Sequence, residues 1–172
     1  GHTEIGPVFP GDPIFVDQAI SYAGQCLFAV AATSLQAARR AVKLAAISID
    51  EQPASLDPVA ATEREEFVRP THVQTRGDWQ RTLDQAEQIV EGELFVGGQE
   101  HFYLEGQACV VHPTEDEGVI VHTSNQHPSE TQKLVAEVLD IPFHAVTVEV
   151  RRMGGGFGGK ETQASPWACI AE

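Results

Sequence analysis

The stretch "HAVTVEVRRMGGGFGGKET", residues 144–162, joins two patterns that together set the fold of this region. Its first part alternates valines with polar side chains, which is the pattern of a strand with one buried face. Five glycines follow between residues 154 and 159, and "ETQASPWACIAE" (161–172) favours the start of a helix. Glycines let backbone N–H groups approach a ligand, and consecutive glycines form an anion-binding nest. The sequence therefore predicts strand, ligand-binding loop and helix, in that order.

Phe157 stands between the glycines of this loop. We expect it to be an apolar wall held out into a cleft. The alternative is a tight connection in which Phe157 fills a hydrophobic pocket. Five glycines exceed what a single turn needs, which favours the first interpretation.

Two nucleotide-binding motifs match the glycine loop only in part. A P-loop needs Gly, four residues, Gly-Lys and then Ser or Thr, whose hydroxyl binds magnesium. Gly154, Gly159 and Lys160 match this spacing, but the next residue is Glu161, whose carboxylate would repel phosphate oxygens. The dinucleotide fingerprint needs an acidic residue about 20 positions further on, and this sequence shows none there. Both motifs are therefore disfavoured.

Clear secondary-structure signals precede the loop. The segments "GQACVVHP" (106–113) and "EGVIVHTSN" (117–125) read as strands, and the short connection between them predicts a hairpin. The segment "HPSETQKLVAEVLDI" (127–141) predicts a helix with Pro128 in its first turn. In this helix we expect Glu130 and Glu137 to face solvent and a buried stripe to consist of Leu134, Val135, Val138 and Leu139.

The first half of the chain predicts a β-α-β unit. An apolar run at 26–31 reads as a strand, Thr33 or Ser34 can cap a helix, and a second apolar run covers 45–49. Residues 51–75 contain three prolines and no sustained periodicity, as expected of a linker or a surface loop. Beyond them, Asp78 is a plausible cap of a short helix to about Ala86, and 87–96 reads as a strand.

Composition excludes several classes of partner. The formal net charge of -14 argues against nucleic acid and anionic membranes, which bind clustered Lys and Arg. No apolar run approaches the length of a membrane helix, so we expect a soluble, cytoplasmic protein. Three widely spaced cysteines fit a reducing compartment and cannot hold an iron–sulfur cluster by themselves. We expect structural roles for Cys26, Cys109 and Cys169.

Acidic and histidine side chains show no metal-ligand spacing. Glu100, His101 and Glu105 match no zinc motif, so we interpret these polar groups as structural or as support for residues that contact a ligand. Four further histidines are scattered along the sequence, and we expect structural or surface roles for His112, His122, His127 and His144.

Several motifs together resemble one enzyme family. The segments "GGQEHFYLE" (97–105), "SNQHPSETQKLVAEVLDIP" (124–142) and "VRRMGGGFGGKET" (150–162) are similar to the molybdenum-binding chain of the xanthine dehydrogenase and aldehyde oxidase family, its bacterial xanthine dehydrogenases above all. The resemblance implies an α+β fold: the end of an α/β hammerhead-like domain at 1–55, a linker at 56–77 and the first part of a molybdopterin-binding domain at 78–172.

The resemblance also implies roles for individual residues. Gln126 would donate a hydrogen bond to an oxygen ligand of molybdenum, whereas ordinary cap chemistry would have it cap the following helix. Backbone groups of Phe157 and Gly158 would meet the oxygen ligands, and Gly156 would let the cofactor come close. Glu161 would bind a purine substrate, and its alternative is a solvated residue at a helix start.

The implied reaction is hydroxylation of an electron-poor carbon, as in the oxidation of hypoxanthine and xanthine to urate, with water as the oxygen source. The alternatives are a hydroxylase of aldehydes or other heterocycles, and a non-catalytic module that kept the fold. The resemblance places FAD and [2Fe-2S] clusters elsewhere in a larger, oligomeric enzyme, on the rest of the molybdenum chain or on a partner subunit. The family's general base and a substrate-facing arginine belong to motifs that this sequence lacks. We therefore expect the 172-residue piece alone to bind no cofactor and to be inactive.

Overall fold

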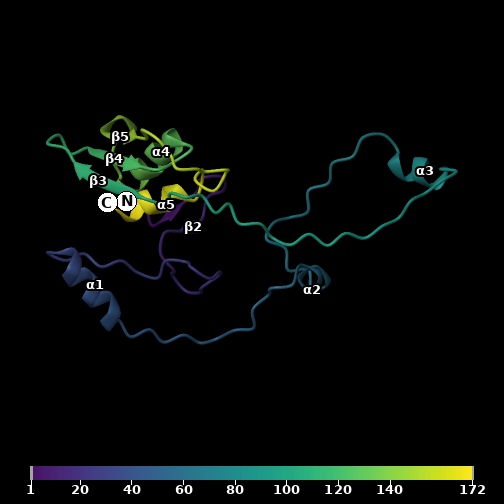
Figure 1. Ribbon diagram of the computed structural model, residues 1–172, viewed down its shortest axis with the longest axis horizontal. Coiled ribbons are helices and arrows are strands. Elements are labelled where there is room, and N and C mark those ends of the chain that lie inside the picture. Colours follow the sequence, from purple (N-terminus) through teal and green to yellow (C-terminus); the bar gives the residue numbers. More distant parts are fainter. Residues whose placement is uncertain (1, 172) are drawn as a thin grey trace. The chain divides into compact units, whose positions relative to one another are not determined.

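The computed structural model describes residues 2–171, which belong to two compact units (Figure 1). One unit combines Gly1–Lys43 with Gly98–Glu172, and the other is Leu44–Gly97. All the residues of the predicted site belong to the first unit. The mixture of helices and strands is the predicted α+β class.

A three-stranded sheet organises the first unit. β3 (Cys109–Pro113) pairs antiparallel with β4 (Val119–Thr123), which confirms the predicted hairpin. β5 (Val146–Glu149) pairs with β4 in parallel, so the sheet order is β3-β4-β5. Parallel neighbours need a crossover connection, and α4 (Pro128–Leu139) with the short 3-10 helix η1 (Phe143–Ala145) supplies it. The glycine loop therefore leaves the edge strand of a small mixed sheet.

The predicted helix over 127–141 is confirmed as α4. Leu134 and Val135 are buried as expected, while Val138 and Leu139 are only partly buried and pack at the margin of the core. The expectation that Glu130 faces solvent is wrong, because its side chain is only 12% exposed. Residues four apart share a helix face, so Glu130 lies on the same side as Leu134.

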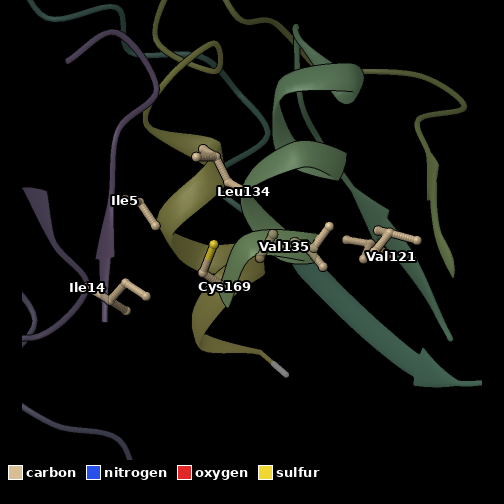
Figure 2. Close-up of a cluster of buried hydrophobic side chains, with 9 residues drawn as sticks. Ile5, Ile14, Val121, Leu134, Val135 and Cys169 are labelled. Carbon is tan, nitrogen blue, oxygen red and sulfur yellow. The ribbon is translucent and has the colours of Figure 1, made fainter. Parts of the chain in front are cut away.

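A small apolar core lies between α4, the sheet and α5 (Ala164–Ile170). Figure 2 shows Val135 of α4 directed toward Val121 of β4, and Leu134 and Cys169 near Ile5. Ile5 and Ile14 come from the N-terminal segment, where β1 (Glu4–Ile5) pairs with β2 (Asp12–Pro13). Thus both ends of the sequence contribute to one core. The predicted helix in 161–172 is confirmed as α5.

The predicted β-α-β unit is correct only in its helix. α1 covers Leu35–Leu44, and the Ser34 hydroxyl accepts a hydrogen bond from the backbone N–H of Ala37, as expected of a cap. The predicted strands at 26–31 and 45–49 are wrong, because both runs are irregular in the structure. A strand needs a ladder of hydrogen bonds to a neighbour, and within residues 2–171 neither run joins a sheet. The run at 26–31 makes one such contact, in which the Cys26 carbonyl accepts from the N–H of Val16 at 2.8 Å.

The second unit contains two short helices. α2 (Pro58–Glu63) is capped by Asp57 and lies inside the predicted linker, where no helix was expected. α3 (Trp79–Asp84) is capped by Asp78, which confirms the predicted cap and helix. The predicted strand at 87–96 is wrong, since this segment is irregular and joins no sheet among the described residues. The hammerhead assignment and the proposed domain boundaries stay predictions.

Within residues 2–171, no helix is both long and apolar enough to cross a membrane.

Candidate functional site

The loop between β5 and α5 contains unusual backbone conformations. Gly155 and Gly158 have φ angles of 103° and 90°, which side chains other than glycine rarely adopt. Phe157, between them, has a φ of 52°, a conformation that costs an ordinary residue about 1–2 kcal/mol. Its side chain is 75% exposed, so in the described part of the chain it does not fill a hydrophobic pocket. A strained and exposed aromatic residue is typical of functional loops.

Gln126 is held against this loop by two backbone donors. Its Oε1 accepts hydrogen bonds from the N–H of Gly158 at 2.9 Å and from the N–H of Lys160 at 3.2 Å. Because only an oxygen can accept from these donors, the orientation of the amide is fixed and its Nε2 faces away from them. Nε2 has no acceptor among residues 2–171. Gln126 does not cap α4, whose start has no side-chain cap bond.

Gly156 permits this close approach. A Cβ atom at position 156 would lie 2.6 Å from Oε1 and 2.7 Å from Cδ of Gln126, distances that real Cβ atoms do not tolerate. Gly156 is itself buried, and its carbonyl accepts the N–H of Gly159 at 2.7 Å. The absence of a side chain at residue 156 is therefore a condition for the position of Gln126.

Lys160 is buried at the base of the loop, with an exposed fraction of 0%. Its Nζ donates to Oε2 of Glu105 at 2.9 Å and to Oγ of Ser124 at 2.8 Å, and it lies 4.7 Å from the centre of the Tyr103 ring. These contacts occupy the ammonium group, so Lys160 is not available to phosphates. The structure thus agrees with the rejection of a P-loop.

Glu105 is the acceptor at the centre of this cluster. The Ser124 hydroxyl, the Gly154 N–H and the Lys160 ammonium all donate to its Oε2. These hydrogen bonds, with that of Ser124 the largest contribution, lower the pKa of Glu105 to about 2. Glu105 is therefore a carboxylate at neutral pH.

Further polar contacts fix the surroundings of the loop. Nε2 of Gln107 donates to the carbonyl of Gly159 at 2.9 Å and to the hydroxyl of Tyr103 at 2.8 Å. Next to Gln126, Nδ2 of Asn125 donates to Oγ1 of Thr131 at 2.6 Å. The loop is thus held from both sides, by residues 103–107 and by residues 124–126.

The sequence did not reveal this supporting cluster. Sequence analysis assigned no role to Lys160, Ser124 or Gln107, and it interpreted Glu105 as structural or as support for ligand-binding residues without naming its partners. The partners are far apart in the chain, since Lys160 and Glu105 are separated by 55 positions. One signal was available in the sequence. A lysine among glycines in a close-packed loop is expected to be buried, and a buried lysine needs an acidic partner elsewhere in the chain.

Glu161 lies beside Lys160 but differs from it in environment. Its side chain is exposed, and it makes no hydrogen bond or ion pair within the described residues. α5 begins three residues later, at Ala164, so Glu161 is not in the first turn of that helix. It is free to contact a ligand or solvent.

The unused donors suit a ligand rich in oxygen acceptors. Within residues 2–171, the N–H groups of Gly155, Gly156 and Phe157 have no hydrogen-bond partner, and neither does Nε2 of Gln126. Such donors fit the oxygen ligands and phosphate of a molybdopterin group. The N–H of Gly158, by contrast, is occupied by Gln126. The described residues contain no group of three or more His, Cys, Asp or Glu side chains that could hold a metal ion.

Comparisons with known proteins identify the family of this chain. The family model of the molybdopterin cofactor-binding domain matches residues 61–172. The chain is 36% identical over 171 residues to a xanthine dehydrogenase of Dictyostelium discoideum, which covers 99% of this chain and 13% of that protein. It is 38% identical over 165 residues to a probable aldehyde oxidase, gad-3, of Caenorhabditis elegans, covering 94% of this chain and 13% of that protein.

A solved structure shows the same relationship. Quinoline 2-oxidoreductase from Pseudomonas putida 86 superimposes with a TM-score of 0.66 at 25% sequence identity, over 81% of this chain and 19% of that one. The chain thus spans 13% of the length of the two curated relatives. On these matches, the chain belongs to the molybdopterin cofactor-binding family of xanthine dehydrogenases and aldehyde oxidases.

Proposed function

We propose that this chain is part of the molybdenum-binding portion of a xanthine dehydrogenase that hydroxylates purines. The similarity to a xanthine dehydrogenase over 99% of the chain supports the class of enzyme. The choice of a purine depends on Glu161, an exposed acid directly after the glycine loop. FAD and [2Fe-2S] clusters belong, in this proposal, to other parts of a cytoplasmic and oligomeric enzyme.

The orientation of the Gln126 amide is the observation that supports the proposal most. Two backbone N–H groups fix its oxygen, which leaves Nε2 as a donor with a defined direction. Such a donor can hold an oxygen ligand of the metal without rearranging when the ligand binds. The N–H groups of Gly156 and Phe157 would add to this hold, whereas Gly158 would contribute by turning the chain and by fixing Gln126.

When bound, the molybdenum cofactor would supply two-electron oxidation of the substrate with an oxygen atom from water. The residues of this chain would position the reactants. Glu161 can accept a hydrogen bond from a ring N–H of a purine, which would orient the ring. The exposed ring of Phe157 can limit the planar substrate on one side and exclude water from it.

An aldehyde-oxidising enzyme is the second candidate function. It is favoured by the 38% identity to a probable aldehyde oxidase, which is no lower than that to the xanthine dehydrogenase. In that case Glu161 would not be needed for turnover. The two candidates share the role of Gln126 and differ in that of Glu161.

Three variants of the full-length enzyme test the proposal. Gln126→Glu keeps an acceptor for Gly158 and Lys160 but replaces the Nε2 donor by a negatively charged oxygen, so we expect turnover per molybdenum to fall by roughly 100-fold or more. We expect a similar fall in turnover per molybdenum for Gln126→Ala. Glu161→Ala should lose roughly 100-fold in kcat/KM for xanthine while molybdenum content is unchanged.

The outcomes separate the candidates. If wild-type enzyme with bound molybdenum ignores xanthine and oxidises aldehydes, and Glu161→Ala keeps that activity, the purine assignment is wrong. If Gln126→Glu retains full turnover per molybdenum, the proposed role of the Gln126 amide is wrong.

A further inference from the structure

We infer that Lys160 is a positioning residue: together with Glu105 and Ser124 it holds the glycine loop on the segment of Gln126, and so fixes the direction of the Gln126 amide. This inference rests on the proposed function, because it concerns the residue that would hold the oxygen ligand. The side chains of Lys160, Glu105 and Ser124 would act through Gln126 and would not contact the ligand themselves.

The first step is the backbone of Lys160. Its N–H donates to Oε1 of Gln126 at 3.2 Å, and its carbonyl accepts from the N–H of Gln126 at 2.7 Å. The backbone N–H and the carbonyl of Lys160 therefore both contact Gln126. Any displacement of residue 160 changes the position of the Gln126 side chain.

The second step is the side chain of Lys160, which fixes that backbone. Its ammonium donates to Ser124, two residues before Gln126, and to Glu105 on a third segment. Oε2 of Glu105 also accepts from the Gly154 N–H at the start of the loop. The loop is consequently held at both of its ends by one carboxylate, and Ser124 joins that carboxylate to the Gln126 segment.

The third step is the burial of the charge. An ammonium group with no exposed surface is stable only when it is paired, because the loss of hydration is large. Glu105 is the carboxylate that pairs with it in the structure. Removal of the Glu105 charge therefore does more than delete a contact, since the buried ammonium must then move toward water and carries its segment with it. Removal of the Lys160 charge deletes the contact itself, because the half-exposed carboxylate of Glu105 is already hydrated.

The test uses full-length enzyme with Lys160→Met, which keeps the length of the side chain and removes its charge. The double variant Lys160→Met/Glu105→Gln removes both charges and leaves no unpaired one, so it guards against a simple failure to fold. Lys133→Met is the matched control, because Lys133 is exposed and forms a surface pair with Glu137 at 3.6 Å.

Two readouts are needed. The first is amide hydrogen exchange of Gly158 and Lys160, the two N–H groups that donate to Gln126, in cofactor-free protein. We expect roughly tenfold or faster exchange in both Lys160 variants and no change in Lys133→Met. The second is xanthine turnover per bound molybdenum, where we expect kcat to fall roughly tenfold or more and KM to change little.

If the amides of residues 158 and 160 exchange at the wild-type rate in both Lys160 variants, the inference is wrong. An unchanged kcat per molybdenum in these variants would also overturn it. A lysine with a merely structural role would lower thermal stability without changing kcat per molybdenum. The Gln126→Ala variant separates this result from a failure of the proposed function. If Gln126→Ala loses turnover while Lys160→Met keeps it, only the positioning role is wrong. If Gln126→Ala keeps full turnover, the proposed function of Gln126 is wrong.

Discussion

The carboxylate of Glu105 joins three separate segments through one oxygen atom. Its pKa is lowered from 4.5 to about 2, so the folded state favours the charged form. A depressed carboxyl pKa stabilises the folded site above the unfolded value near 4.5, and this stabilisation is lost as the pH falls through about 2. The contacts of Glu105 should therefore be complete at neutral pH and weaken in acid.

The variant Glu105→Gln allows a test of this pH dependence. At pH 6 the Gly154 amide, which donates to Oε2 at 2.9 Å, should exchange faster in the variant than in the wild type. We expect the ratio of the two rates to fall toward one as the pH decreases from 4.5 to about 2, since the wild-type carboxyl then becomes neutral as well. Comparison at equal pH removes the intrinsic pH dependence of exchange. A ratio that is constant over this range would contradict the assigned role of the charge.

Single residues of the site were predictable to different extents. Gln126 and Phe157 were found because they stand in distinctive motifs, and the structure brings Gln126 against the loop of Phe157. Their roles toward a cofactor stay predictions. The pairing of Lys160 with Glu105 could not be found from spacing, because it connects positions that only the folded sheet brings together.

Among the helices, α4 has an unusual C-terminal end. Asp140 adopts a left-handed conformation with a φ of 57°, and the following Ile141 N–H donates to the carbonyl of Ala136 at 3.0 Å. Glycine is the preferred residue at such a position, and a negative charge is unfavourable at the C-terminus of a helix. The natural aspartate is therefore not the most stable choice.

We predict that Asp140→Gly stabilises the end of α4 by about 1 kcal/mol. The substitution removes the left-handed strain and the unfavourable charge, and the greater flexibility of glycine in the unfolded chain offsets part of this gain. Amide exchange of Ile141 should then slow about fivefold. Asp140→Asn is the control that removes the charge but keeps a side chain, and its effect should be smaller. Faster exchange in Asp140→Gly would mean that the aspartate makes a stabilising contact in the full-length protein.

Helices were easier to predict than strands. α1, α3, α4 and α5 are signalled by local features, namely caps and a repeating apolar face, and each is found in the structure. The hairpin of β3 and β4 is also local. The apolar runs at 26–31, 45–49 and 87–96 were interpreted as strands, but a strand depends on pairing with a distant segment, and within residues 2–171 none of these runs joins a sheet.

At the scale of the whole molecule, apolar surface is abundant. Many large apolar side chains are more than four-fifths exposed, among them Leu94, Phe95, Phe102 and Leu104. Monomeric soluble proteins rarely expose apolar residues in such number without a partner surface. The chain also spans only 13% of the length of its curated relatives. We propose that further segments of a longer protein cover these side chains and complete the cofactor site.

This proposal predicts the behaviour of the 172-residue chain on its own. The donors of residues 155–157 and Gln126 would meet only one part of a cofactor, so the binding free energy should be too small for stable retention. We expect the purified chain to contain no stoichiometric molybdenum by elemental analysis and to show no xanthine-dependent dye reduction. The full-length enzyme, produced in the same host, is the control for cofactor supply. Stoichiometric molybdenum in the isolated chain would show that the glycine loop and Gln126 segment form a sufficient site, and that the rest of the enzyme is needed for catalysis alone.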